Sequence, residues 1–283
     1  MIVSRFAPSP TGRLHLGHAF SAIRAHDLAR QAGGRFLLRI EDIDPGRSRE
    51  GFVSGIEEDL AWLGLAWDGP VVRQSDRLGL YAAALARLQE GKLVYPCFCT
   101  RAEIAAASLS APHGVEPIYP GTCRGLIAPD LDRPHCWRLD VTKALSILPG
   151  TGEDLLWHDG AAGWVRADPS AHGDVILARK DAPASYHLAV TIDDAAQGVT
   201  DVVRGADLFA ATHVHRLLKA LLGLPTPRYH HHPLFTGSDG ERLAKRHGSP
   251  TLAALRDAGA DGREIASMLR ERRLPADFGA GSD

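Results

Sequence analysis

The first 40 residues place a helical pattern between two short apolar segments, and this arrangement constrains the fold more than any other feature. Residues 2–6 and 35–40 are apolar and of strand length. Between them, Pro and Gly residues at 8–12 predict a turn, and apolar residues at near-helical spacing from Gly17 predict a helix that ends at a Gly-Gly pair. A strand, a helix and a second strand in this length form a βαβ unit, which predicts a parallel sheet and an α/β fold.

Further along the chain, the apolar pattern predicts more helices and one more strand-like run. Helices are expected over about 48–63, 76–90 and 206–222, and the strand-like run covers 186–204. In the last of these helices, four leucines are expected to face inward: Leu217, Leu218, Leu221 and Leu222.

The middle of the chain differs from the rest in composition and in apolar periodicity. Between Cys97 and about residue 180, Pro and Gly are dense and short alternating segments replace the helical pattern. We therefore expect an α+β module inserted into the main domain. The first half of the main domain is expected at 1–95 and its second half at 183–250. The inserted module lies between them at 96–182, and a short helical segment follows at 251–283.

Composition and charge exclude several classes of protein. No apolar run approaches the ~18 residues of a membrane-spanning helix, and the N-terminal residues lack the basic and apolar segments of a secretory signal. Four cysteines are too few for a disulfide scaffold. These features predict a cytoplasmic protein with no membrane partner. The net charge of −2 argues against a general nucleic-acid coat but allows a local face for RNA.

Two histidines at the predicted turn between the first strand and the first helix are suited to bind phosphate. His15 and His18 flank Gly17, where the absence of a side chain lets phosphates approach the backbone. The start of the helix offers unpaired N–H groups, and the histidines add donors where negative charge builds up during transfer. The pattern predicts a nucleoside triphosphate site.

A second basic segment follows a predicted loop near the end of the chain. It reads Arg242-Leu-Ala-Lys245-Arg246, and Lys245 is one of five lysines among 32 basic residues. A lysine ammonium on such a loop can hold phosphates as a compact point charge. We therefore expect Lys245 to act with the histidine pair.

Three cysteines have a spacing suited to a metal. Cys97 and Cys99 precede Cys123 by 26 and 24 residues, and three thiolates suit a tetrahedral Zn²⁺ that stabilises a loop-rich module. Spacing alone leaves the fourth ligand open among three candidates: His113, His135 and Cys136. The zinc is expected to be structural, because the chemistry proposed below needs no metal hydroxide.

The two phosphate-binding segments carry a family resemblance. His15-Leu-Gly-His18 and the segment around Lys245 resemble the HIGH and KMSKS motifs of class I aminoacyl-tRNA synthetases, although the second motif has Arg242 and Ala244 in place of its usual lysine and serine. Longer segments are similar to the glutamyl branch: RFAPSPTGRLHLGH, LLRIEDID, WLGLAWD and VVRGADL. A short catalytic core with a Cys-x-Cys element, without a long anticodon-binding region, resembles the glutamyl-Q tRNA(Asp) synthetase family.

This resemblance implies a Rossmann-like class I catalytic domain with an inserted zinc-bearing module. It also implies that the chain uses ATP to activate L-glutamate to glutamyl-adenylate without tRNA. Glutamate would then be transferred to queuosine in the anticodon of tRNA(Asp). Magnesium is expected with ATP, and a monomer is expected. His15, His18 and Lys245 would be catalytic and would bind ATP together with Gly17, and the metal ligands would be Cys97, Cys99, Tyr119 and Cys123.

The resemblance also implies which residues bind glutamate, and charge supports several of them. Two carboxylates and one ammonium require two cationic partners and one anionic partner, which Arg5, Arg204 and Glu41 supply. The full set implied by the resemblance is Arg5, Phe6, Ala7, Pro8, Ser9, Glu41, Tyr186 and Arg204.

Three alternatives compete with this prediction. A compact glutamyl-tRNA synthetase would attach glutamate to the 3′ end of a tRNA. A small-molecule ligase such as pantothenate synthetase shares a HIGH-type motif, but it would not explain the paired arginines with Glu41 or the three cysteines. A non-catalytic RNA-binding paralogue would be expected to lose the ATP motifs, whereas both histidines and Lys245 are present.

Two further clusters point to metal only weakly. Consecutive residues at 230–232, all histidine, point in different directions on a strand and rarely bind one ion. The acidic pairs at 42/44 and 193/194 could hold magnesium, but acidic turns are usually solvated.

Overall fold

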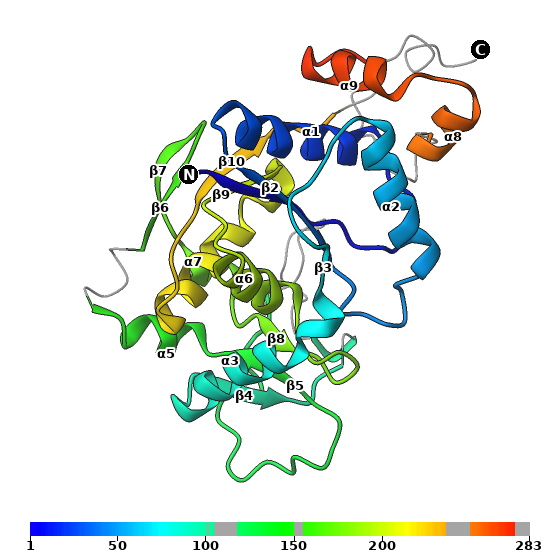
Figure 1. Cartoon of the computed structure of the whole chain (residues 1–283). Coiled ribbons are helices and arrows are strands. Elements are labelled where there is room, and N and C mark those ends of the chain that lie inside the picture. Colours follow the sequence, from blue (N-terminus) through cyan, green and yellow to red (C-terminus); the bar gives the residue numbers. More distant parts are fainter. Residues whose placement is uncertain (101, 105–117, 150–154, 236–249, 275–283) are drawn as a thin grey trace, which may run out of the picture.

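The computed structural model describes residues 1–100, 102–104, 118–149, 155–235 and 250–274, and every structural statement below concerns this part of the chain (Figure 1). Within it the strands form three sheets.

The predicted N-terminal βαβ unit is present. β1 (Val3–Phe6) pairs in parallel with β2 (Arg35–Ile40), and β3 (Val72–Arg73) extends this sheet beyond β2. α1 (Leu16–Gln31) connects β1 to β2, because a parallel pair needs a crossover rather than a tight turn. The α/β prediction is confirmed.

A second sheet continues from the other edge of β1. Its strands follow the order β7 (Gly163–Arg166), β6 (Leu156–Asp159), β10 (Arg228–His232) and β9 (Asp201–Gly205). β10 runs parallel to both β9 and β6, whereas β6 and β7 form an antiparallel hairpin. The Thr200 N–H donates to the Val3 carbonyl at 2.9 Å, so the residue before β9 lies directly beside β1.

Helices cover both faces of these parallel strands. On β9, Val202 packs into a core with α3 (Leu78–Glu90), α6 (Tyr186–Ala196) and α7 (Ala211–Leu222). The next residue, Val203, packs into the opposite core, which is built from α1, α2 (Glu50–Trp62), α8 (Leu252–Asp257) and α9 (Gly262–Arg270). Alternate residues of a strand face opposite sides, so a sheet buried on both faces must be apolar at both positions. None of the described helices combines the length and the apolar character needed to cross a bilayer.

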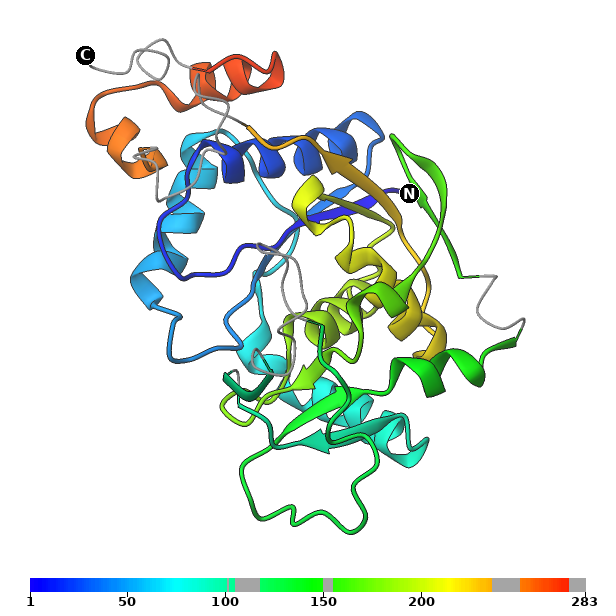
Figure 2. The ribbon, with the colours of Figure 1, turned by 180° about the vertical axis from the view of Figure 1, so that it is seen from behind.

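The region expected to form one inserted module divides between two sheets. β4 (Val94–Cys97), β5 (Cys136–Leu139) and β8 (Ile176–Ala178) form a separate antiparallel sheet, and α5 (Val141–Ser146) follows β5. The β6–β7 hairpin instead joins the second sheet, because Trp157 is buried against Phe209 and Tyr229. Figures 1 and 2 both show the β4–β5–β8 sheet at the opposite end of the molecule from α8 and α9.

The prediction of a strand over 186–204 is wrong for the first half of this range. Residues 186–196 form α6, and the strand β9 begins at Asp201. The Ser185 hydroxyl accepts the Leu188 N–H and so caps the helix. Helix and strand are difficult to distinguish here because a short segment buried on several sides has no clear apolar period.

The helix predicted over 206–222 is confirmed from Ala211 onward as α7, after a short 3₁₀ turn. Leu217, Leu218 and Leu222 are buried as expected, whereas Leu221 is half-buried. Three short 3₁₀ helices complete the described elements: Gln74–Arg77, Pro169–His172 and Ala206–Leu208.

A buried carboxylate links α6 both to α3 and to the 3₁₀ turn that precedes it. The Asp193 side chain is fully buried and accepts hydrogen bonds from Gln74 at 2.8 Å, Arg77 at 2.6 Å and the Tyr81 hydroxyl at 2.8 Å. Removing one partner of a buried ion pair leaves the other charge uncompensated. The orientation of α6 therefore depends on Asp193.

We predict that Asp193→Ala lowers the free energy of unfolding by about 3–5 kcal/mol, because it leaves buried donors without an acceptor. Asp181→Ala is the matched control: Asp181 also pairs with an arginine, but its side chain is 60% exposed. The control should cost less than about 1 kcal/mol. Urea unfolding followed by circular dichroism measures both, and equal losses for the two variants would contradict the prediction.

Candidate active site

A cavity of about 700 Å³ lies at the carboxyl ends of the parallel strands. The strand ends Phe6, Gly205 and His232 line it, which is where ligands bind in α/β sheets. The cavity brings together every described residue that the sequence predicts to bind glutamate or ATP: Arg5, Phe6, Ala7, Pro8, Ser9, His15, Gly17, His18, Glu41, Tyr186 and Arg204. Lys245 lies outside the described residues.

The histidine pair begins α1 and uses one nitrogen of each ring to do so. His15 is the N-cap, and its Nδ1 accepts the Gly17 N–H at 3.1 Å. The His18 Nδ1 in turn accepts the His15 N–H at 3.3 Å, and the two ring centroids lie 3.8 Å apart. A neutral imidazole whose Nδ1 accepts a hydrogen bond carries its proton on Nε2. Both rings therefore have Nε2–H donors at a helix N-terminus that lines the cavity.

Gly17 leaves room for the His15 ring in this arrangement. A Cβ at position 17 would lie 3.1 Å from the His15 ring carbon Cε1 and 3.2 Å from its Nδ1. These contacts are tight, so a larger residue would push the His15 ring away from its capping position.

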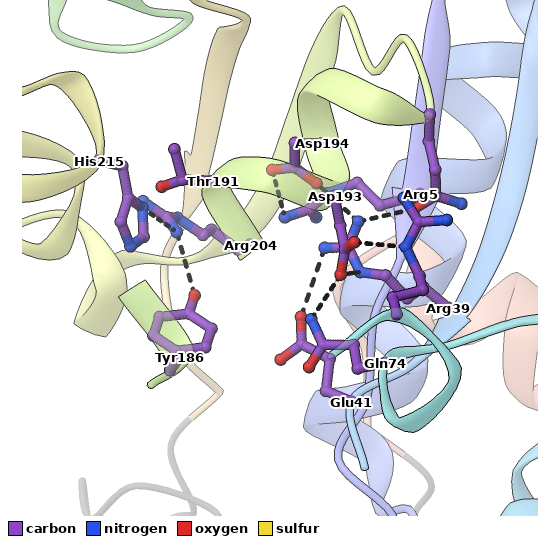
Figure 3. Close-up of polar contacts among 12 residues, drawn as sticks. Arg5, Arg39, Glu41, Gln74, Tyr186, Thr191, Asp193, Asp194, Arg204 and His215 are labelled. Atoms are coloured by element: carbon purple, nitrogen blue, oxygen red, sulfur yellow. Dashed lines mark hydrogen bonds and ion pairs between the residues drawn. The ribbon is translucent and has the colours of Figure 1, made fainter. Parts of the chain in front are cut away.

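The carboxylate of Asp194 accepts hydrogen bonds from two arginines, Arg5 and Arg39 (Figure 3). Its Oδ1 accepts from Arg5 Nε and from Arg39 Nη1, both at 2.9 Å, and the Arg39 Nη2 reaches Glu41 at 3.4 Å. Burial alone would raise the pKa of Asp194, but the charges of Arg5 and Arg39 hold it well below its usual range. Asp194 is therefore ionised and orients Arg5.

Glu41 directly follows β2, and its side chain is 8% exposed. Burial raises the pKa of Glu41, and the nearby charges of Arg39 and Arg5 only partly offset this effect. A bound ammonium group would stabilise the ionised form of Glu41. The residue is therefore suited to a cationic group of a ligand.

Arg204 on β9 is held by four hydrogen-bonding side chains, two of which, Tyr186 and His215, are labelled in Figure 3. It donates from Nη1 to the Tyr186 hydroxyl at 3.2 Å and from Nη2 to Thr212 Oγ1 at 2.6 Å. His215 Nδ1 lies 3.4 Å from Nη1, and His231 Nε2 accepts from Nε at 3.1 Å. Burial and the Arg204 charge lower the pKa of His215 well below its usual value, so this ring is neutral.

Sequence reasoning missed the residues that hold the two arginines: Asp194 as a structural partner, Arg39, Thr212, His215 and His231. One signal could have found two of them. Thr212 and His215 are three residues apart on α7, which places both on the same helix face.

The three consecutive histidines have three different partners, as expected. His230 Nε2 bonds Asp201 at 2.8 Å, His231 Nδ1 bonds Asp159 at 2.7 Å, and His232 Nε2 bonds the Ser21 hydroxyl at 2.8 Å. They do not converge on one point.

The carboxylates considered for magnesium already have protein donors. Asp193 and Asp194 lie on α6 in the buried ion pairs described above. Asp42 accepts from Arg73 at 2.9 Å and from the Ser75 hydroxyl at 2.8 Å, and Asp44 accepts from Arg47 at 2.9 Å. We therefore assign no magnesium ligand to these four residues.

The three predicted cysteines converge beside the β4–β5–β8 sheet. The Sγ atoms of Cys97, Cys99 and Cys123 all lie within 4.8 Å of one another, and the last two are 3.5 Å apart. The Tyr119 hydroxyl lies 3.6 Å from Cys99 Sγ and accepts the Cys123 N–H at 2.9 Å. This donor set fits a thiophilic ion bound in a tetrahedron.

The other candidates for the fourth ligand are placed differently. His135 is half-buried, and its Nδ1 bonds the Arg133 carbonyl at 2.9 Å. Cys136 pairs with Cys97 across β4 and β5 but is not within 4.8 Å of all three sulfurs. His113 lies outside the described residues. The geometry favours Tyr119.

Comparisons with known proteins agree with this architecture. Residues 1–275 match the family model of the class I tRNA synthetase (E and Q) catalytic domain. The Glutamyl-Q tRNA(Asp) synthetase of Rhodobacter capsulatus is 50% identical over 283 residues, which span 95% of this chain and 99% of that protein. The protein of the same name from Symbiobacterium thermophilum is 46% identical over 280 residues, or 95% and 85% of the two chains.

A solved structure is similar along nearly the whole chain. The glutamate tRNA ligase from Elizabethkingia meningosepticum, crystallised with its amino acid, matches with a TM-score of 0.78 and 26% identity. The match covers 98% of this chain and 62% of that one. Taken with the sequence relatives, it shows that the chain is an enzyme of the aminoacyl-tRNA synthetase class and belongs to the glutamyl-Q tRNA(Asp) synthetase family.

Proposed function

We propose that this enzyme activates L-glutamate with ATP in the absence of tRNA and transfers the glutamate to queuosine in the anticodon of tRNA(Asp). One observation supports the activation of glutamate with ATP: a single cavity holds a histidine pair at a helix N-terminus together with Arg5, Arg204 and Glu41. The names of the relatives support the acceptor, because those proteins are called Glutamyl-Q tRNA(Asp) synthetases.

In the first step, a glutamate α-carboxylate oxygen attacks the α-phosphorus of ATP, and pyrophosphate leaves. The carboxylate is already ionised, so the step needs no general base. The Nε2–H groups of His15 and His18 stabilise the charge that builds up on the phosphate oxygens, and Lys245 is expected to add a cation. ATP would bring Mg²⁺ with it, and Gly17 lets the phosphates approach the backbone.

Glutamate is recognised by charge at two ends of the cavity. Arg5 and Arg204 attract its carboxylates, and Glu41 attracts its ammonium. Burial raises the pKa of Tyr186, so its hydroxyl is protonated. Because this oxygen accepts from Arg204, its own proton is available to a substrate carboxylate. The backbone from Phe6 to Ser9 completes the site.

In the second step, a hydroxyl oxygen of the modified base attacks the carbonyl carbon of glutamyl-adenylate. An ester forms, and AMP leaves. The hydroxyl proton passes to the departing phosphate or to water. Both steps depend on positioning and electrostatic stabilisation.

The cysteine cluster is proposed to hold one structural Zn²⁺, with ligands from Cys97, Cys99, Tyr119 and Cys123. When bound, the ion would link β4 to the segment that carries Tyr119. The small antiparallel sheet has few buried side chains in this region, so the ion would supply stability that packing does not.

We predict that labelled glutamate appears on tRNA(Asp) only when the tRNA carries queuosine, and that nuclease digestion places the label in the anticodon loop. Matched tRNA(Asp) without queuosine is the control. Label at the 3′ end of tRNA(Glu) would instead show a compact charging enzyme and would contradict the proposed acceptor.

We predict that His15→Asn lowers glutamate-dependent ATP–pyrophosphate exchange by roughly 10²–10³-fold, the usual cost of losing one donor to a developing charge. Asparagine is a good N-cap, so α1 should still form. His26→Asn is the control, because His26 lies on the same helix but bonds Asp27 and packs on Phe36. Exchange within about threefold of wild type in His15→Asn would contradict this role.

We predict one zinc per chain by elemental analysis, lost in Cys99→Ser and retained in Cys136→Ser. Tyr119→Phe should bind zinc more weakly, and chelation should lower the melting temperature of the wild type. Zinc retained in Tyr119→Phe but lost in Cys136→Ser would show that Cys136, not Tyr119, is the fourth ligand.

A further inference from the structure

We propose that Asp159 and His231 are positioning residues for Arg204, which they hold in the orientation that binds a substrate carboxylate. The inference rests on the proposed function of Arg204. Asp159 ends β6 and His231 lies on β10, so neither residue is close to Arg204 in the sequence. Together they form a hydrogen-bond chain that runs from β6 through β10 to the guanidinium on β9.

The chain of contacts is short and buried. His231 Nδ1 lies 2.7 Å from Asp159 Oδ2, and His231 Nε2 lies 3.1 Å from Arg204 Nε. The side chains of His231 and Asp159 are 3% and 2% exposed. The backbone N–H of His231 also donates to Asp159 Oδ2 at 3.1 Å, which aligns the carboxylate with the ring.

The position of the proton on His231 follows from the hydrogen-bonding capacity of Arg204. A guanidinium has donors and no acceptor, so His231 Nε2 must present a lone pair to it. The single proton of the neutral ring is then on Nδ1, where it donates to Asp159. Asp159 thus determines the tautomer of His231, and the tautomer determines whether His231 can hold Arg204.

The protonation states agree with this assignment. Burial and the Arg204 charge lower the pKa of His231 to about 4, so the ring is neutral near pH 7. Burial alone would raise the pKa of Asp159, but hydrogen bonds from Ala162, His231 and Ala161 lower it to about 2. An ionised Asp159 can only accept, which leaves no alternative direction for the hydrogen bond.

The preceding residue on the same strand, His230, also pairs with a carboxylate and can be compared with His231. His230 Nε2 bonds Asp201 at 2.8 Å, but the His230 side chain is 30% exposed. His230 and His231 point to opposite faces of β10, and Arg204 contacts only the second. The Asp201–His230 pair therefore has similar chemistry without a connection to Arg204.

The test is Asp159→Asn in the full-length enzyme. Asparagine keeps an oxygen for the Ala161 and Ala162 N–H groups but presents an amide N–H to His231 Nδ1. The ring proton then moves to Nε2 and faces the Arg204 Nε–H, so Arg204 loses its acceptor. We expect the KM for glutamate in ATP–pyrophosphate exchange to rise roughly 10- to 100-fold, as when the partner that orients a binding group is removed. The kcat and the KM for ATP should change by less than about threefold.

Two further variants separate positioning from a structural role. His231→Gln keeps an oxygen for Arg204, so the double variant Asp159→Asn/His231→Gln should regain most of the glutamate affinity. His231→Leu removes the acceptor without changing Asp159 and should raise the glutamate KM even if Asp159→Asn does not fold. Asp201→Asn is the matched control and should leave the glutamate KM unchanged.

A readout that does not depend on activity is the ring-nitrogen NMR spectrum of His231. It should show Nδ1–H in the wild type and Nε2–H in Asp159→Asn. An Nε2–H in the wild type, an unchanged KM in both Asp159→Asn and His231→Leu, or equal KM increases in Asp159→Asn and in the double variant would overturn the inference. A wild type without glutamate-dependent exchange would overturn the proposed function instead, and the NMR tautomer would still test the hydrogen-bond chain.

Discussion

The cavity depends on one buried carboxylate, Asp194, which accepts hydrogen bonds from arginines on two neighbouring strands. Arg5 comes from β1 and Arg39 from β2, whereas Asp194 comes from α6 more than 150 residues later. None of these charges is stable when buried alone, so the strands and the helix must assemble together. The same helix begins with Tyr186, so the ion pairs that fix α6 also fix the wall of the cavity.

The cavity is lined by two kinds of polar group, imidazole N–H donors and arginine cations, and different neighbouring residues orient each kind. At one end, the start of α1 holds two neutral imidazoles in a tautomer that can donate to phosphate. At the other end, neutral histidines accept from Arg204 and leave its charge undiminished. Neutral acceptors therefore contact Arg204, whereas an ionised carboxylate, Asp194, contacts Arg5. This difference would make Arg204 the stronger attractor for a substrate carboxylate, because Asp194 already balances part of the charge of Arg5.

The sequence predicted the parts of the fold that have a clear local pattern. The βαβ unit, α7 and the convergence of Cys97, Cys99 and Cys123 follow from apolar period, turn residues and spacing. The helix at 186–196 could not be predicted in this way, because its apolar residues are buried on several sides. The sequence places the β6–β7 hairpin within the inserted module, because nothing local shows that Trp157 packs on Phe209.

Only those residues of the candidate site that belong to a sequence motif or carry a matching charge could be predicted. The residues at the cavity surface follow from the histidine motif, from charge and from the family resemblance. The residues that orient them do not line the cavity. Asp194 contacts Arg5, and Asp159 contacts His231, which contacts Arg204; each contact joins segments far apart in the sequence. Such contacts leave no local pattern, so only the folded chain shows them.

The most direct test of this account is the amino-acid dependence of ATP–pyrophosphate exchange by the full-length enzyme without any RNA. We expect exchange with glutamate and little with glutamine, which lacks the second carboxylate that the two arginines require. Exchange that needs tRNA, or equal exchange with glutamine, would contradict this expectation.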